Sequence, residues 1–548
     1  MAEQKQNKPW FNYHSSLAPA LVFLVCVPLL CHLLFSQFGL SLSDDGFTLA
    51  YSRRILEGQV PHRDFIIIRP AFSPLLHTPL VLFGGAYTFW LSRFFVWVEL
   101  ASIAWAWLIF AQNCLGTDLK TYETLYFALL FFVSSTHSFP IMAWHTLDGL
   151  FCLAIGLALC SQSSPQRKFG GYFILGLAPL CKQSFVFLVP LALFLLGDGR
   201  KKLLWLALLL PSSLYFGLLA WLGAFPAAML QLGTHTNLRY AGFQRYLEQP
   251  LTSLGFISGY FLLRLAQKNP KDAFGQRFGQ FTLFLLPNLT VIAGLASGYL
   301  PIAAFGLFGM VSGALFFLLL EQRQTSKAQL RFALLGLLAA WSASLSVGYN
   351  TPVLSTGSLV IPLLLFARGK PFLPPTWNQV YLSGLTLLAL GSFGQARVTY
   401  LSREPPAAQL TYRLDGVFPG ANLIKTNAYK YAFLTDLQAA IALAQRERAT
   451  FAILPNLPGY WAKAPTQNPL SLDWPQQTEL FSPALQQRFL AELKAKRPQL
   501  TFIVEKVDSE TLATGFQPVP RTDFYQFAWY VRDHFTKVGE TAFFELYR

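Results

Sequence analysis

Two adjacent carboxylates, Asp44 and Asp45, follow the first long apolar segment of the chain. That segment, 17–38, is nearly continuous apolar sequence and is long enough to cross about 30 Å of hydrocarbon as a helix. A carboxylate that emerges at this point can act as a general base at the bilayer surface. The competing interpretation is a solvated acidic pair that only ends a helix.

A third carboxylate, Asp148, stands near the start of another apolar segment, three residues after His145. Ionisable groups at membrane depth are costly, so they are functional candidates by default. Asp is also a favoured helix N-cap, and both interpretations stay open. His145 either donates to a phosphate or lies at the interface. We therefore predict Asp44, Asp45 and Asp148 as catalytic residues.

Several cations are candidates for holding an anionic group. Arg69 interrupts an apolar run, and arginine can bind phosphate oxygens through two parallel hydrogen bonds. Lys182 separates two apolar runs, where snorkelling to the headgroups is the alternative. The predicted phosphate-binding residues are Arg69, Lys182, Arg239, Arg245 and His145.

Two further groups of charged residues have structural interpretations. Glu99, midway along the second apolar segment, is expected to pair with an arginine such as Arg93. An amphipathic helix on the membrane surface would account for the adjacent Arg53 and Arg54.

The composition indicates which elements position these residues. Hydrophobic residues make up 53% of the 548 and charged residues only 13%, against about a quarter in soluble proteins. The formal net charge is +15, of which residues 401–548 contribute +2. The remaining excess lies mostly in short loops, which the positive-inside rule explains without a nucleic-acid partner. The six cysteines suggest packing residues rather than a disulfide framework.

We predict a polytopic α-helical membrane protein with about thirteen transmembrane helices. Alternate loops are basic, which places the N-terminus in the cytoplasm and leaves the long loops 40–88 and 224–250 outside. The predicted spans are 17–39, 89–112, 123–138, 148–162, 170–181, 183–197, 203–223, 251–266, 279–297, 300–320, 331–348, 355–367 and 377–395. Several are shorter than the usual ~20 residues and suggest broken or tilted helices, notably the pair around Lys182.

The last 150 residues differ in character from the transmembrane domain, 1–398. Short apolar runs at 450–454 and 500–504 predict buried strands, and helical periodicity covers 434–448 and 483–496. Such alternation predicts an extracytoplasmic α/β domain over 399–548. The Pro405-Pro406 pair is the expected hinge.

The first loop resembles the GT-C glycosyltransferases, in particular the family 39-like branch of protein O-mannosyltransferases and lipid A aminoarabinose transferases. The resemblance rests on Asp44-Asp45-Gly46-Phe47, on the stretch 50–58 (AYSRRILEG) and on Arg63-Asp64-Phe65. The Lys182-Gln183 segment is also similar to a recurrent family segment. Two positions depart from the pattern: Asp45 replaces Glu, which leaves Asp44 as the expected base, and Arg69-Pro70 stands for Lys-Pro.

This resemblance implies transfer of a sugar from a polyprenyl-phosphate donor to a lipid, glycan or exported protein, outside the cell membrane and with inversion. It also implies a possible divalent metal ion, because some superfamily members hold one with acids of the first two outer loops. Asp44, Asp45 and Asp148 are candidate ligands, although three carboxylates are weak evidence for a metal.

The main alternative is a transporter or a lipid-linked sugar flippase without transferase activity. Such proteins usually carry charged residues near mid-membrane and often inverted repeats. In this chain the ionisable residues gather on the predicted outer side, and no repeat is visible. An assembly component that lacks catalysis and an oligosaccharide ligase or polymerase also fit. The sequence does not name the sugar or the acceptor.

Overall fold

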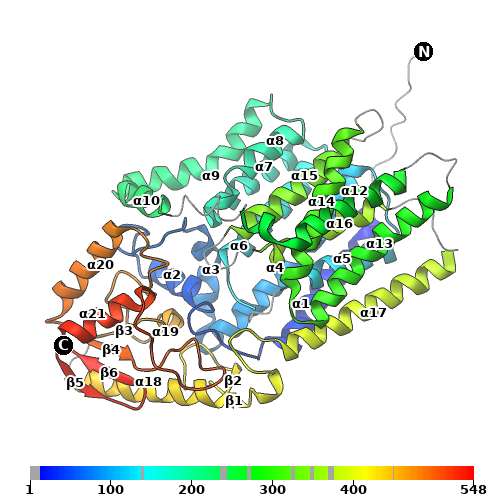
Figure 1. Ribbon diagram of the computed structural model, residues 1–548. Helices are drawn as coiled ribbons and strands as arrows, with labels where there is room; N and C mark the ends of the chain where they lie inside the picture. Colours follow the sequence, from blue (N-terminus) through cyan, green and yellow to red (C-terminus); the bar gives the residue numbers. More distant parts are fainter. Residues whose placement is uncertain are drawn as a thin grey trace.

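The computed structural model describes residues 13–136, 141–234, 244–267, 273–321, 327–345, 351–367, 375–447 and 450–548. The protein is predominantly helical, and its strands lie in the C-terminal region (Figure 1). Among the described residues, five helices are long and apolar enough to cross a membrane, which is compatible with a membrane protein. They are α1 (Tyr13–Phe35), α4 (Thr88–Leu115), α9 (Lys202–Trp221), α13 (Ala273–Ala296) and α14 (Leu300–Leu320).

Each of the thirteen predicted segments contains a helix, and the total that cross a membrane stays a prediction. The other eight helices are α5 (Thr121–Ser134), α6 (His145–Cys160), α7 (Pro165–Cys181), α8 (Leu188–Leu195), α12 (Pro250–Gln267), α15 (Lys327–Ser344), α16 (Thr356–Phe366) and α17 (Pro375–Thr399).

Small residues bring two of these helices into backbone contact. A Cβ atom on Gly313 of α14 would collide with the backbone oxygen of Phe256 in α12, and one on Gly259 of α12 would collide with Met310 of α14. Apolar helices pack this closely in membranes through small side chains, because lipid supplies no hydrophobic drive between them.

The chain breaks at Lys182, as the short apolar runs around it predict. Helix α7 ends at Cys181, and Lys182 adopts an extended conformation (φ −152°, ψ 126°) before the short 3-10 helix η2 (Gln183–Phe185) and α8. The break exposes backbone groups in the helical bundle, and the 3-10 turn satisfies part of them.

The 40–88 segment forms α2 (Phe47–Leu56), α3 (Phe72–Phe83) and η1 (Gly85–Tyr87), and 224–250 contains α10 (Phe225–Leu232). Most residues of helix α2 are buried inside the protein. It packs against α19 (Pro458–Lys463), where the backbones meet so closely that a Cβ on Gly46 would collide with Gly459. The surface-helix interpretation is wrong for Arg54, whose side chain is 4% exposed and pairs with Asp473 at 2.7 Å.

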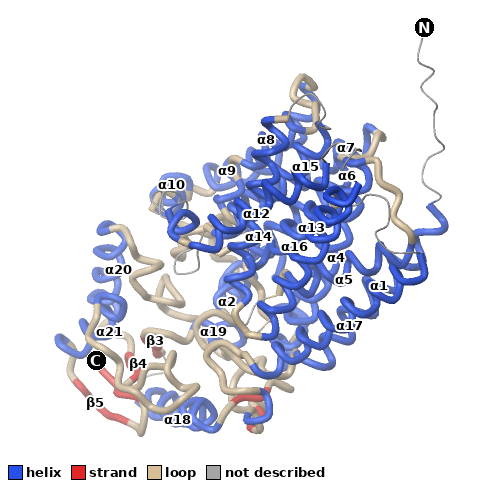
Figure 2. Tube along the Cα trace, turned by 45° about the vertical axis from the view of Figure 1, so that its right-hand side comes forward, coloured by secondary structure: helices blue, strands red, loops and turns tan. Residues whose placement is uncertain are grey.

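The predicted strands and helices of the C-terminal region are confirmed. A four-stranded sheet has the order β3-β4-β6-β5, with β3 parallel to β4 and the other pairs antiparallel. Figure 2 shows β3, β4 and β5 in red near the C-terminus. The strands are β3 (Phe451–Leu454), β4 (Thr501–Glu505), β5 (Lys537–Glu540) and β6 (Phe544–Tyr547), with a separate pair β1 (Tyr412–Arg413) and β2 (Lys425–Thr426). The longer helices are α18 (Ala428–Glu447), α20 (Pro483–Lys496) and α21 (Gln526–His534).

The C-terminal region and the 40–88 segment share one hydrophobic core. Leu49 and Val81 belong to the same buried cluster as Phe433 and Ile503, and α2 and α3 lie between the helical bundle and the sheet (Figure 1). Beside the expected hinge, Glu404 is buried in an ion pair with Lys430 and accepts hydrogen bonds from the backbone N–H of Leu40 (3.0 Å) and from Asn427 (2.7 Å). These contacts fix the junction rather than leave it free to pivot.

Candidate functional site

The two adjacent aspartates have different environments. The Asp45 side chain is 2% exposed and forms an ion pair with Arg93, whose own side chain is 1% exposed. Arg93 also donates to the backbone oxygens of Ser36 (2.7 Å) and Gly39 (2.6 Å). One guanidinium therefore fixes the segment that follows the end of α1. The expected pairing of Arg93 with Glu99 is therefore wrong, because Asp45 occupies the guanidinium.

Asp44 faces the opposite way, toward the C-terminal region. Its side chain is 21% exposed and accepts from Arg403 at 2.9 Å, while Arg403 also contacts Glu510 at 2.6 Å. Burial raises the pKa of the Asp44 carboxyl above its ordinary value, and the nearby Arg403 and Arg69 oppose this rise. A carboxylate with a raised pKa is a stronger general base.

Three of the predicted phosphate-binding residues lie within electrostatic range of one another: Arg69, His145 and Lys182. The Arg69 guanidinium is 2.8 Å from a Glu479 oxygen and lies over the Phe47 ring, with the guanidinium carbon 5.7 Å from the ring centroid. Because Arg69 also acts on Asp44, this one guanidinium lies within electrostatic range of the candidate base and of the other two residues.

Lys182 and His145, the other two of these three residues, are buried. The Lys182 ammonium donates to the Thr146 hydroxyl (2.9 Å) and to the backbone oxygen of Ala343 (3.3 Å), so it does not snorkel away from the protein. The centroids of the His145 and Phe47 rings are 4.8 Å apart, and the rings meet edge to face. Both His145 nitrogens are buried and have no hydrogen-bond partner among the described residues, so they can accept or donate to a ligand.

Asp148 has a third, separate environment. It is the fourth residue of α6, whose N-cap is Trp144, so the N-cap interpretation is wrong. It is fully buried, it accepts from the Ser73 hydroxyl, and one oxygen lies 3.1 Å from His77 Nε2. Because the three aspartates have different partners, nothing in the described contacts joins them into one metal site.

The other two predicted phosphate-binding residues, Arg239 and Arg245, are not shown to lie near Arg69, His145 and Lys182. Arg239 lies outside the described residues. Arg245 is about half exposed, and its recorded ion pair is with Glu248 on the same helical turn at 4.0 Å.

No sequence pattern pointed to Arg403, Glu479 and Glu510, because they lie in the C-terminal region and reach the site only through the tertiary fold. His77 had a weak signal as a histidine within an apolar run. No family model, curated protein or solved structure matches this chain.

Proposed function

We propose that this protein is a membrane glycosyltransferase, which moves a sugar from a polyprenyl-phosphate donor to an acceptor on the extracytoplasmic side. The observation that carries the proposal is that Arg69 lies within electrostatic range of both Asp44, a carboxylate with a raised pKa, and Lys182. General-base transfer from a phosphate-linked sugar needs this combination of a base and anion-binding groups.

In the proposed reaction, Asp44 takes the proton of the acceptor hydroxyl or amine. The acceptor atom then bonds to the anomeric carbon while the bond from that carbon to the phosphate oxygen breaks. Polyprenyl phosphate leaves with the electron pair, and Arg69 and Lys182 stabilise its negative charge. Attack opposite the leaving group inverts the anomeric configuration.

Arg403 limits when Asp44 can act. Its guanidinium bonds both Asp44 and Glu510 in this arrangement, at 2.9 and 2.6 Å. An acceptor that bonds Asp44 has to share or displace the Arg403 contact, and Glu510 offers Arg403 a remaining partner. Asp148 and Asp45 are assigned no contact with the reacting groups, because both side chains are buried against other residues.

The proposed topology has about thirteen spans, a cytoplasmic N-terminus and the C-terminal region outside the cell membrane. The helix within each predicted segment and the basic alternate loops support it. An outer placement puts Asp44 on the side where exported acceptors lie.

The decisive experiment compares Asp44→Asn with the wild type, using purified protein and labelled polyprenyl-phosphate sugar. We expect release of polyprenyl phosphate to fall by about 10²–10⁴-fold in the variant, as for loss of a general base. The matched control is Asp64→Asn, which changes an aspartate of the same loop that pairs with Arg63 at 2.8 Å, and it should retain activity.

Full activity in Asp44→Asn would remove Asp44 from the mechanism. Movement of the intact donor between leaflets by the wild type, without release of polyprenyl phosphate, would identify a flippase and overturn the transferase proposal.

A further inference from the structure

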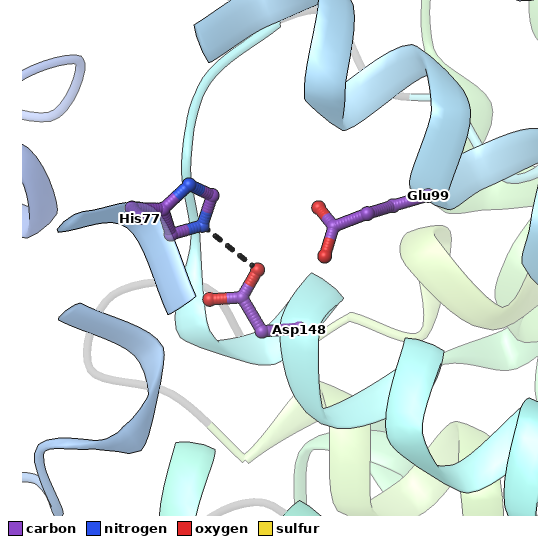
Figure 3. A group of neighbouring side chains, drawn as sticks. All are labelled: His77, Glu99 and Asp148. Atoms are coloured by element: carbon purple, nitrogen blue, oxygen red, sulfur yellow. Dashed lines mark hydrogen bonds and ion pairs between the residues drawn. The ribbon is translucent and has the colours of Figure 1, made fainter. Parts of the chain in front are cut away.

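Three metal-ligating side chains from three helices meet in the interior. His77 comes from α3, Glu99 from α4 and Asp148 from α6, and one ligand atom from each lies within 4.8 Å of the others. All three residues are fully buried. Figure 3 shows the Glu99 carboxylate directed toward Asp148 and His77, with Asp148 bonded to the imidazole.

The polar atoms of this cluster are not fully used within the protein. Neither oxygen of Glu99 accepts a hydrogen bond from any described residue, and His77 Nδ1 is likewise without a partner there. Buried polar groups are nearly always paired, so unpaired ones call for an explanation such as an ion. The cluster thus has converging metal-ligating atoms, and some of them have no hydrogen-bond partner within the described residues.

The charge of the cluster also favours a bound cation. Neither carboxylate has an ion pair with Lys or Arg among the described residues. Asp148 contacts the Ser73 hydroxyl and His77, and the Glu99 carboxyl lies within hydrogen-bonding range of it. Two carboxylates taken out of water without a cation are strongly unfavourable. A divalent cation would neutralise both charges at once.

The geometry points to a bound metal: we propose that His77, Glu99 and Asp148 bind one divalent transition-metal ion of the Zn²⁺ class. One imidazole nitrogen with two carboxylates suits Zn²⁺, whereas Mg²⁺ prefers oxygen ligands and retains water. Ligand atoms of one Zn²⁺, at about 2.0–2.2 Å from the ion, lie roughly 3–4 Å apart, so the cluster needs only a small contraction.

A neighbouring hydrogen bond fits an ion at this place. Ser73 donates to one Asp148 oxygen and leaves the other directed at His77, which is how outer hydrogen bonds orient a metal-binding carboxylate. The thiols of Cys152 and Cys181, both free, lie within electrostatic range of Glu99 but are not among the three converging ligands.

The ion would tie α3, α4 and α6 together. His77 is within electrostatic range of His145, the second residue of the cluster defined by Arg69, His145 and Lys182. The metal would therefore position that part of the site and would not touch the reacting groups, because its three ligands have no exposed surface.

The test measures metal content in the purified full-length protein, independently of transfer. The protein is incubated with Zn²⁺, separated from free ion by gel filtration and analysed by elemental mass spectrometry. We expect about one ion per chain in the wild type and a loss of about tenfold or more in Glu99→Gln. The matched control is His32→Gln, which changes another buried histidine, bonded to Ser36 at 2.8 Å, and should keep the ion.

A second measurement keeps the proposal testable if Glu99→Gln does not fold. X-ray absorption of the zinc-loaded wild type should report nitrogen and oxygen ligands, including one imidazole. A wild type that retains less than about a tenth of an ion per chain after exposure to Zn²⁺, Mn²⁺ and Fe²⁺ would overturn the proposal and leave a proton shared by the two carboxylates. An all-sulfur ligand shell would overturn it too. Neither result bears on whether Asp44 acts as a base.

Discussion

The adjacent aspartates allow a sharp test, since replacing each by asparagine should have opposite effects. Asp45→Asn leaves the Arg93 guanidinium buried without a countercharge. Removing one partner of a buried ion pair costs about 3–5 kcal/mol, because the remaining charge stays desolvated. Arg93 keeps its bonds to the carbonyl oxygens of Ser36, Phe38 and Gly39, which places the expected loss near the lower end, about 3 kcal/mol.

Asp44→Asn should cost far less in stability. The side chains of Asp44 and Arg403 are 21% and 37% exposed, so solvent screens the pair, and Arg403 keeps Glu510 as a partner. Partly exposed ion pairs contribute about 0–1 kcal/mol. The two variants therefore differ by at least about 2 kcal/mol in the free energy of unfolding.

The assay is thermal unfolding of both variants and the wild type in the same detergent at the same scan rate. We expect the midpoint to fall by roughly 3–6 °C in Asp45→Asn and by no more than about 2 °C in Asp44→Asn. Transfer activity should show the reverse order, with the greater loss in Asp44→Asn. Equal midpoints for the two variants would refute the assignment of Asp45 as a buried anchor and of Asp44 as the available carboxylate.

Three further predictions concern other contacts. Arg403→Gln removes a cation that stabilises the charged form of Asp44, so the Asp44 pKa should rise further. The acidic limb of the pH–rate profile should then move to higher pH. An unmoved limb would exclude an electrostatic interaction between Arg403 and Asp44 during catalysis. Burial lowers the pKa of His62 to about 4 in the folded protein. Between about pH 6.5 and 4 the unfolded chain therefore binds a proton at this histidine that the folded chain does not. The free energy of unfolding should fall as the pH drops through this range, by up to on the order of 3 kcal/mol. His62→Gln should flatten that pH dependence in denaturation curves, and an unchanged slope would assign it to other groups. Asp473→Ala leaves the buried Arg54 without a countercharge, although it keeps its bonds to Gln59 and to the Leu470 backbone oxygen, so the expected cost is near the lower end of the range, about 3 kcal/mol. Limited proteolysis should then cleave the C-terminal region faster than in the wild type.

Local sequence patterns were sufficient for the elements but not for their pairings. Apolar runs and periodicity predicted the strands at Phe451–Leu454 and Thr501–Glu505 and the helix at Pro483–Lys496, because these patterns act over a few neighbouring residues. They also predicted that the first loop carries Asp44. The partner of that aspartate, Arg403, is 359 positions away, and no periodicity encodes such a contact.

The same limit explains the misassigned charges. Glu99 and Arg93 lie in the same apolar segment and were expected to pair, but tertiary packing gave Arg93 to Asp45 and directed Glu99 toward Asp148. Likewise, Arg53 and Arg54 looked alike in sequence, yet Arg54 is buried against Asp473 while Arg53 pairs with Glu57, the residue that follows its own helix. Which of two neighbouring residues on a helix is buried depends on which side of that helix another region covers.

The bond between Arg54 and Asp473 spans 419 positions, and this separation has a consequence for biogenesis. At roughly 5–20 residues per second, the ribosome needs about 20–80 s after making the arginine to supply its partner. Throughout that interval the nascent first loop has an unmatched positive charge and an uncovered apolar side. A chain halted before its final third would retain that defect, so quality-control proteases should distinguish incomplete from finished copies by this one loop.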